Sequence, residues 1–186
     1  MSPPAHRVWT GDTWIDVSVP ESGGEAVVVP NVAAVVLREP DRSAILLQRR
    51  DKPGEVVRGR WEVPGGRWRA GESSEEAIRR EVEEETALTV RSITSPVTSF
   101  AAEPNVGIEV SDPVAVVAGV DGAFPSLHVV IECTARGEPM PLDGETADPT
   151  WWPIDDLRTA LEDRPSDFVW QSHAILSAWL QRQSQH

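Results

Sequence analysis

The most constraining part of this sequence is the segment from Gly66 to Leu88, GRWRAGESSEEAIRREVEEETAL. A helix is predicted to begin near Ser73, because Ser73 and Glu76 have the three-residue spacing of a capping box. From there to Glu85 every residue except the serines is a good helix former, and neither Gly nor Pro interrupts the run. The chain must therefore pack a strongly acidic helix against its core.

Three glutamates fall on one side of this predicted helix. At about 100° per residue, Ile78 and Val82 mark the buried stripe, and Glu81, Glu84 and Glu85 lie within an arc that borders it. Carboxylates turned together toward the protein body would repel one another and lose hydration. A hard divalent cation such as Mg²⁺, bound by oxygen ligands beside substrate phosphates, would remove both penalties. The alternative for an acidic run of this kind is a solvated helix.

The wider spacing of this segment resembles the Nudix box, G-x5-E-x7-R-E-U-x-E-E-x-G-U, where U is an apolar aliphatic residue. Eight of the nine specified positions match over 23 residues, beginning with Gly66, Glu72 and Arg80. The preceding WEVPGG also resembles the usual lead-in of that family. The departure is Ala87, which stands where the family usually has Gly, and Ala is unfavourable there if the helix ends with a positive φ.

Composition limits the partners of the chain. A formal charge of −13 and a pI near 4.7 argue against a nucleic-acid polymer or an anionic membrane as partner. The single cysteine, Cys133, excludes an intramolecular disulfide and lies in an apolar run that predicts a buried thiol. No apolar run approaches the ~20 residues needed to span a bilayer, and the N-terminus lacks a signal pattern. These features predict a cytoplasmic protein of one domain with an ample core.

The resemblance implies the α/β fold class, as a Nudix-type α/β/α sandwich with a central mixed sheet. Residues 31–186 would form the single Nudix domain with a C-terminal helix, and residues 1–30 would form an N-terminal arm. Gly11-Asp12 predicts a two-residue hairpin turn in the arm. Because such arms often help to form dimers in ADP-ribose-hydrolysing relatives, a homodimer is a hypothesis.

Within the domain, apolar β-branched runs predict strands at 32–37, 44–48 and 89–93, and an antiparallel pair at 113–120 and 127–135. Helices are predicted at 155–161 and from Ser166 or Asp167, either of which could cap it, to near Gln183. Segment 94–112 is predicted to be a loop or extra strands overhanging the cleft. The alternative is that the segment has only a structural role and none at the cleft.

Polar residues outside the box are candidates for substrate contact. Arg49 and Arg50 follow a predicted strand just before the catalytic loop, where they could bind phosphates, although solvated charges at a loop are the alternative. Trp68 lies in a polar loop, where its ring could form a cleft wall. By family resemblance, an acidic residue before Trp151-Trp152 would reach back to the metals. Glu145 is the first candidate and Asp148 the second.

The resemblance implies Mg²⁺- or Mn²⁺-dependent hydrolysis of a nucleoside diphosphate linked to another group. Glu81, Glu84 and Glu85 would hold the cations, with the Gly66 carbonyl as an extra ligand. Glu145 or a box glutamate would deprotonate or orient the water. By family resemblance, Glu72 and Arg80 would form a structural ion pair.

The substrate is predicted to be a small nucleotide. ADP-ribose or a nucleotide sugar is slightly favoured for two reasons. The first is the N-terminal arm, and the second is Pro104, because a Pro at this distance after the box resembles the pattern of the ADP-ribose pyrophosphatase branch. An oxidised or normal nucleoside triphosphate is the runner-up, and a catalytically silent Nudix-fold nucleotide-binding module is the alternative from a different class.

Overall fold

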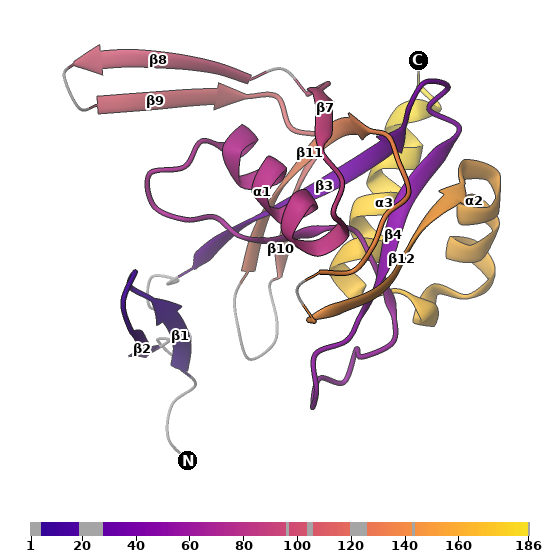
Figure 1. Ribbon diagram of the computed structural model, residues 1–186, viewed down its shortest axis with the longest axis horizontal. Helices are drawn as coiled ribbons and strands as arrows, with labels where there is room; N and C mark the ends of the chain where they lie inside the picture. The colour runs from indigo at the N-terminus through magenta and orange to yellow at the C-terminus, as the bar shows by residue number, and fades with distance from the viewer. Residues whose placement is uncertain are drawn as a thin grey trace.

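The centre of the protein is a mixed eight-stranded sheet (Figure 1). The computed structural model describes residues 5–18, 28–95, 97–103, 106–119, 126–142 and 144–185. Five strands lie in the order β10 (Ala115–Gly119), β11 (Ser126–Ala135), β3 (Val29–Arg38), β4 (Ala44–Arg50) and β12 (Thr146–Pro153). The central β11–β3 pair is parallel, whereas β10 pairs with β11, β3 with β4 and β4 with β12 antiparallel.

Short strands complete the sheet beside its centre. β5 (Trp61–Glu62) pairs with β4, β6 (Gly65–Arg67) pairs with β3, and β7 (Val90–Ile93) pairs with β11, all antiparallel. The β6 pairing fixes the backbone of the box loop against β3, with Gly66 opposite Val32. The start of the Nudix-like segment is therefore part of the sheet.

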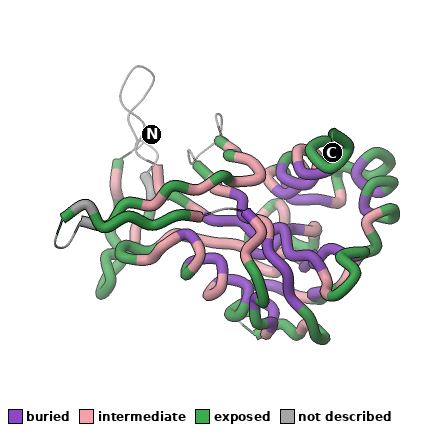
Figure 2. The backbone as a smooth tube through the Cα atoms, turned by 90° about the horizontal axis from the view of Figure 1, so that it is seen from above, coloured by how far each residue is buried: buried purple, intermediate pink, exposed green. Residues whose placement is uncertain are grey.

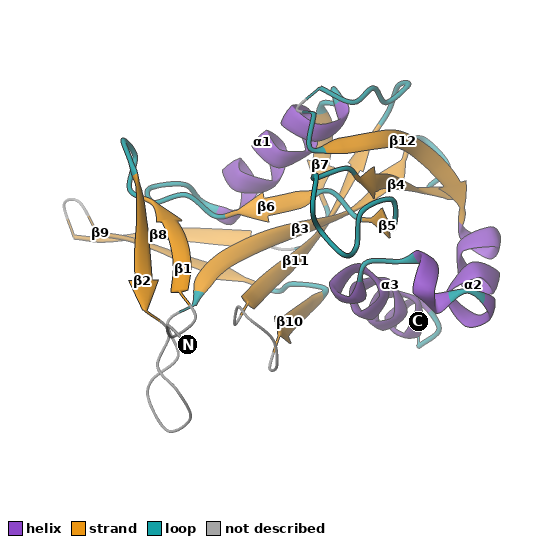
Figure 3. Cartoon of the chain, turned by 90° about the horizontal axis from the view of Figure 1, so that it is seen from below, coloured by secondary structure: helices purple, strands orange, loops and turns teal. Residues whose placement is uncertain are grey.

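Helices cover both faces of the sheet (Figure 3). α1 (Ser74–Thr86) packs on one face over Val32, Ala34 and Val36, which alternate along β3. α2 (Ile154–Asp163) and α3 (Trp170–Gln183) pack on the other face with the intervening residues of the same strand. This arrangement confirms the predicted α/β/α sandwich with a mixed sheet.

The capping box of α1 is present as predicted. Ser73 Oγ accepts from Glu76 N at 3.2 Å, and the Glu76 carboxylate accepts from Ser73 N at 2.8 Å. The helix ends at Ala87, whose φ of 58° lies in the left-handed region. The unusual alanine of the box therefore occupies a conformation that glycine would adopt with less strain.

Two hairpins lie outside the main sheet (Figures 1 and 2). β1 (Ala5–Trp9) and β2 (Trp14–Ser18) pair around Gly11-Asp12, and Thr10 N donates to Thr13 O at 2.9 Å across the turn. Segment 94–112 forms extra strands, β8 (Val97–Glu103) and β9 (Val106–Ser111). Glu109 of this second hairpin accepts a 2.9 Å hydrogen bond from Ser74 N and so contacts the start of α1. Both the division at residue 30 and the homodimer stay predictions.

The start of the last helix differs from the prediction. A 3₁₀ turn, η1 (Pro165–Asp167), precedes α3, and neither Ser166 nor Asp167 caps the helix. Phe168 is extended and fully buried, and Val169 N donates to Trp61 O at 2.9 Å. Because this bridge to β5 holds the backbone extended, the helix can begin only at Trp170.

Three remaining expectations concern single residues or the whole chain. Cys133 is buried as predicted, and burial raises the pKa of its thiol to about 12. Pro104 lies outside the described residues. Across the described ranges, no helix is both long and apolar enough to cross a membrane.

Candidate metal and catalytic site

Only two of the three box glutamates are buried against the body of the protein. Glu81 and Glu85 are 8% and 6% exposed, because they flank the Ile78–Val82 stripe that packs on the sheet. Glu84 is nearly half exposed and lies 3.4 Å from Arg69. The expectation that all three carboxylates turn inward is therefore wrong for Glu84 in this structure, because its position on the helix lies farther from the buried stripe.

Glu85 is the most deeply held of the three glutamates. Its Oε2 accepts hydrogen bonds from Gln48 Nε2 at 2.7 Å and from Gly65 N at 2.9 Å. Burial raises the pKa of Glu85 well above its ordinary value, against the two hydrogen bonds, and the charges of Glu62 and Glu81 raise it further. Keeping these carboxylates ionised is therefore unfavourable in the site, and a bound cation would offset that cost.

Glu81 rests against the backbone of Gly66. A Cβ added at Gly66 would lie 2.5 Å from Glu81 Oε2, so any side chain there would displace this carboxylate. Burial raises the pKa of Glu81, and the neighbouring Arg80 guanidinium partly offsets that rise. The glycine of the box is thus required for the close approach of loop and helix.

The ion pair expected between Glu72 and Arg80 is present. Arg80 Nε and Nη2 donate to the two oxygens of Glu72 at 2.6 and 2.8 Å, and Nη2 also donates to Arg67 O at 3.1 Å. The hydrogen bonds from Arg80 lower the pKa of Glu72. Arg80 Nη1 contacts Glu81 as well, so the same guanidinium ties the box loop to the helix and to a buried carboxylate.

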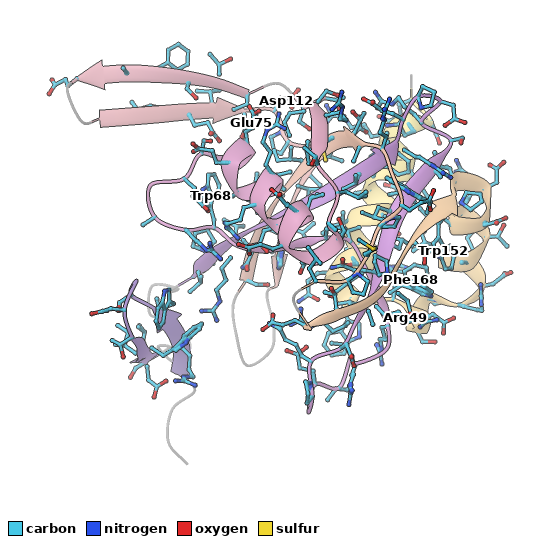
Figure 4. The ribbon with its side chains drawn as sticks, in the orientation of Figure 1. Arg49, Trp68, Glu75, Asp112, Trp152 and Phe168 are labelled. Atoms are coloured by element: carbon cyan, nitrogen blue, oxygen red, sulfur yellow. The ribbon has the colours of Figure 1, made fainter. Side chains whose placement is uncertain are left out.

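Trp68 and Arg49 lie in different parts of the molecule (Figure 4). Trp68 Nε1 donates to Glu72 O at 3.0 Å, and its ring packs on the core beneath α1. Arg49 lies over the ring of Trp61 at 3.9 Å, beside Trp152 and Phe168. The structure gives Trp68 a packing role, and substrate contact by either residue stays a prediction.

Arg49 and Arg50 point to opposite faces of the sheet. Arg49 contacts Trp61, which packs on the α3 side, whereas Arg50 lies 3.7 Å from Glu62 near the box glutamates. Arg50 also donates to Glu55 at 2.7 and 3.0 Å. Of the two predicted phosphate ligands, Arg50 is therefore on the same face as the buried carboxylates.

Glu145 lies directly before β12, whose first residue, Thr146, contacts the end of α1. The hydroxyl Oγ1 of Thr146 donates to Glu85 O at 3.4 Å. The Glu145 carboxylate forms an ion pair with Lys52. Asp148 instead lies 3.8 Å from Arg49, in a bulge where its own φ is 48°. Glu145 therefore adjoins a residue that contacts the end of the box helix, whereas Asp148 contacts Arg49, and the catalytic role of Glu145 stays a prediction.

Two buried polar residues of this site were not predicted as functional residues. Gln48 is fully buried and contacts Glu85, and Glu62, opposite it in register, is 8% exposed and raises the pKa of Glu85. A polar residue at an inward position of an apolar strand was the available signal for Gln48. For Glu62, the signal was a carboxylate inside the lead-in just before the two glycines.

The donor set of this site suits a hard divalent cation. Carboxylate and backbone carbonyl oxygens are the ligands that Mg²⁺ and Mn²⁺ prefer. In the part of the chain that the structure describes, no three His, Cys, Asp or Glu side chains are already gathered into a metal-binding cluster. Arg80 and Arg69 hold Glu81 and Glu84, so both carboxylates would have to leave these cations to share an ion.

Comparisons with known proteins agree with this geometry. The family model of the NUDIX domain matches residues 28–172. A Caenorhabditis elegans protein named as a nudix hydrolase is 46% identical over 59 residues, which cover 31% of this chain and 15% of that protein. The match thus spans much less than two thirds of that relative's length.

Two solved structures share the fold. The MutT NUDIX hydrolase from Burkholderia pseudomallei has a TM-score of 0.58 at 21% identity, covering 82% of this chain and 98% of that one. The NUDIX domain of Shewanella oneidensis NrtR, solved with ADP ribose, has a TM-score of 0.59 at 17% identity, covering 88% and 94%. Because the family model covers most of the sequence and the fold agrees with it, the chain belongs to the Nudix family, whose hydrolases act on phosphoanhydride bonds.

Proposed function

We propose that this protein is a divalent-cation-dependent pyrophosphohydrolase that cleaves a nucleoside diphosphate linked to a second group. The observation that carries the proposal is the pair of buried box glutamates, Glu81 and Glu85, held against the backbone of Gly65 and Gly66. Two carboxylates that are buried side by side with raised pKa values are costly to keep charged unless a cation joins them.

Different residues of the site have different roles in the proposed reaction. Glu81, Glu84, Glu85 and the Gly66 carbonyl would hold Mg²⁺ or Mn²⁺, which neutralises charge on the phosphate oxygens when bound. Glu145 or one of the box glutamates would orient the attacking water. The Arg80–Glu72 pair keeps the box loop against α1, so that the ligand oxygens stay close to one another.

Cationic side chains near the carboxylates would bind the phosphates. Arg50 lies on the face of the glutamates, and Lys52 is paired with Glu145 on the same side of the site. On the opposite face, the guanidinium of Arg49 lies over the ring of Trp61, which packs against Trp152, and a nucleobase could stack at this group of side chains.

ADP-ribose or a nucleotide sugar is the favoured substrate class within the proposal. Support comes from the shared fold with a NUDIX domain solved with ADP ribose and from the β1–β2 hairpin, which Arg67 joins to the box loop. Arg67 Nη1 donates to Arg7 O at 2.7 Å, so the hairpin contacts the residue next to Gly66. A nucleoside triphosphate, normal or oxidised, is the second substrate class.

A substrate panel tests the activity. ADP-ribose, nucleotide sugars, diadenosine polyphosphates, and normal and oxidised nucleoside triphosphates would each be incubated with Mg²⁺, with Mn²⁺ and with chelator, and products separated by chromatography. Cleavage of one class that chelator abolishes is expected. No cleavage of any compound, with tight binding of one nucleotide, would replace the enzyme with a nucleotide-binding module.

Glu84→Gln tests the metal-site assignment. We expect kcat to fall by about 10²-fold or more, because the amide cannot supply the charge of a ligand or base. Glu83→Gln is the matched control, since Glu83 is exposed on the neighbouring position of the same helix. Undiminished turnover by Glu84→Gln would remove Glu84 from the catalytic site.

A further inference from the structure

The buried amide of Gln48 lies on the face of the sheet that carries the box glutamates. Its neighbours Leu47 and Leu46 belong to the α3-side and α1-side cores respectively, so the alternation of β4 turns Gln48 toward α1. Gln48 is fully buried, near the end of β4, where it lies opposite Glu62. A primary amide in such a place is costly unless its donors and acceptor are used.

One half of this amide holds Glu85. Gln48 Nε2 donates to Glu85 Oε2 at 2.7 Å, and the Gly65 N–H donates to the same oxygen at 2.9 Å. Both hydrogen bonds found for this carboxylate within the described residues therefore fall on Oε2. The two donors thus hold Oε2 in place, and neither of them occupies the other oxygen, Oε1.

The other half of the amide has no partner. Gln48 Oε1 is buried and accepts no hydrogen bond from any residue that the structure describes. A buried acceptor without a donor beside a carboxylate that repels its neighbours is an unusual arrangement for a purely structural amide. Such an acceptor would be satisfied by a donor that enters together with the cation or the substrate.

We propose that Gln48 is a positioning residue of the Nudix site, which fixes Glu85 through its amide nitrogen and offers its carbonyl oxygen to a donor that enters with the bound cation or substrate. The inference rests on the proposed function, because it assigns Glu85 to a divalent-cation site. It goes beyond the box motif, since Gln48 lies on a different strand. Residues that hold metal ligands in place typically change metal affinity by about 10- to 100-fold when removed.

Gln48→Met tests this role directly. Methionine has a similar length and needs no hydrogen bond in an apolar core, so the variant should fold. We expect its Mn²⁺ affinity, measured on the substrate-free protein by electron paramagnetic resonance, to fall by about 10- to 100-fold. Activity lost at low Mn²⁺ should return in large part at saturating Mn²⁺, with little change in KM for the nucleotide.

Ser172→Ala is the matched control. Ser172 is also buried and accepts a hydrogen bond from Val63 N at 3.2 Å, but it lies on α3, across the sheet from the glutamates. Its removal should change the melting temperature without changing Mn²⁺ affinity. Gln48→Asn keeps the amide nitrogen and the carbonyl oxygen on a side chain that is one methylene shorter, so it should also lose Mn²⁺ affinity. This variant decides the question if the Met variant does not fold.

Wild-type Mn²⁺ affinity in a folded Gln48→Met or Gln48→Asn protein would overturn the inference. Wild-type protein that binds Mn²⁺ but cleaves no member of the panel would overturn the proposed hydrolysis, while the comparison of affinities would still decide the role of Gln48. Wild-type protein that binds no Mn²⁺ would overturn both.

Discussion

The two faces of the central sheet differ in what they bury. The α3 face buries large apolar side chains, with Phe168, Leu176 and Trp179 at most 2% exposed. The α1 face buries an apolar stripe as well, but at one end it also encloses the carboxylates of Glu81 and Glu85. The α3 face therefore contributes chiefly apolar burial to stability, whereas the α1 face also buries carboxylates that are destabilising when ionised.

This difference has a direct electrostatic signature. The pKa values of Glu81 and Glu85 are both raised, chiefly by burial, although Arg80, Gln48 and Gly65 donate to their oxygens. The native state therefore opposes the charged form that a metal site needs. A fold can keep such a site only when other regions supply enough apolar burial, as the α3 face does.

The largest expected effect is on the apolar face. Leu176→Ala should lower the free energy of unfolding by about 2–5 kcal/mol, because it removes a fully buried side chain from α3. Its Mn²⁺ affinity, measured where the variant is folded, should stay as in wild type. Val82→Ala, the counterpart on α1, should lose less stability but weaken Mn²⁺ binding, since it loosens the helix that carries the glutamates. If both variants weakened Mn²⁺ binding equally, the metal site would depend on the two faces of the sheet alike.

A second prediction concerns the charged face. In chelator, Glu85→Gln should melt higher than wild type at neutral pH while losing Mn²⁺ binding and activity. The pKa of Glu85 is raised in the native state, so its contribution to stability is complete below its ordinary pKa near 4.5 and is lost as pH rises through the raised value. The amide does not ionise, so the gap between the two melting temperatures should widen as pH rises. A gap that is constant from pH 4.5 to 8 would contradict this, and Mn²⁺ should raise only the wild-type melting temperature.

The smallest expected effect is at the end of α1. Ala87→Gly should stabilise the protein by about 0.5–1 kcal/mol, because the φ of 58° at this position strains any residue with a Cβ. Thermal melting measures this as a rise of about 2–4 °C per kcal/mol for a domain of this size. Ala77→Gly, at a buried position in the first turn of the same helix, is the control and should destabilise. A loss of stability in Ala87→Gly would mean that the left-handed end of the helix is not strained.

Local sequence determined the parts of the protein that depend on short spacings. The capping box at Ser73 and Glu76 acts within one turn of helix, so the start of α1 could be predicted. The continuous apolar run at residues 32–37 likewise indicated a strand, which is buried on both faces. The spacing of the box was enough to indicate the family, the sandwich and the ion pair between Glu72 and Arg80.

Contacts between distant segments decided the rest. Gln48 and Glu85 are 37 residues apart, so their hydrogen bond exists only once β4 and α1 share one face of the sheet. The bridge from Trp61 to the segment before α3 moved the helix start to Trp170, against the capping residues available in the sequence. A sequence pattern reports which side chains can approach an ion, but burial and the competing arginines, which arise only from packing, decide how strongly each carboxylate is held and how costly its charge is.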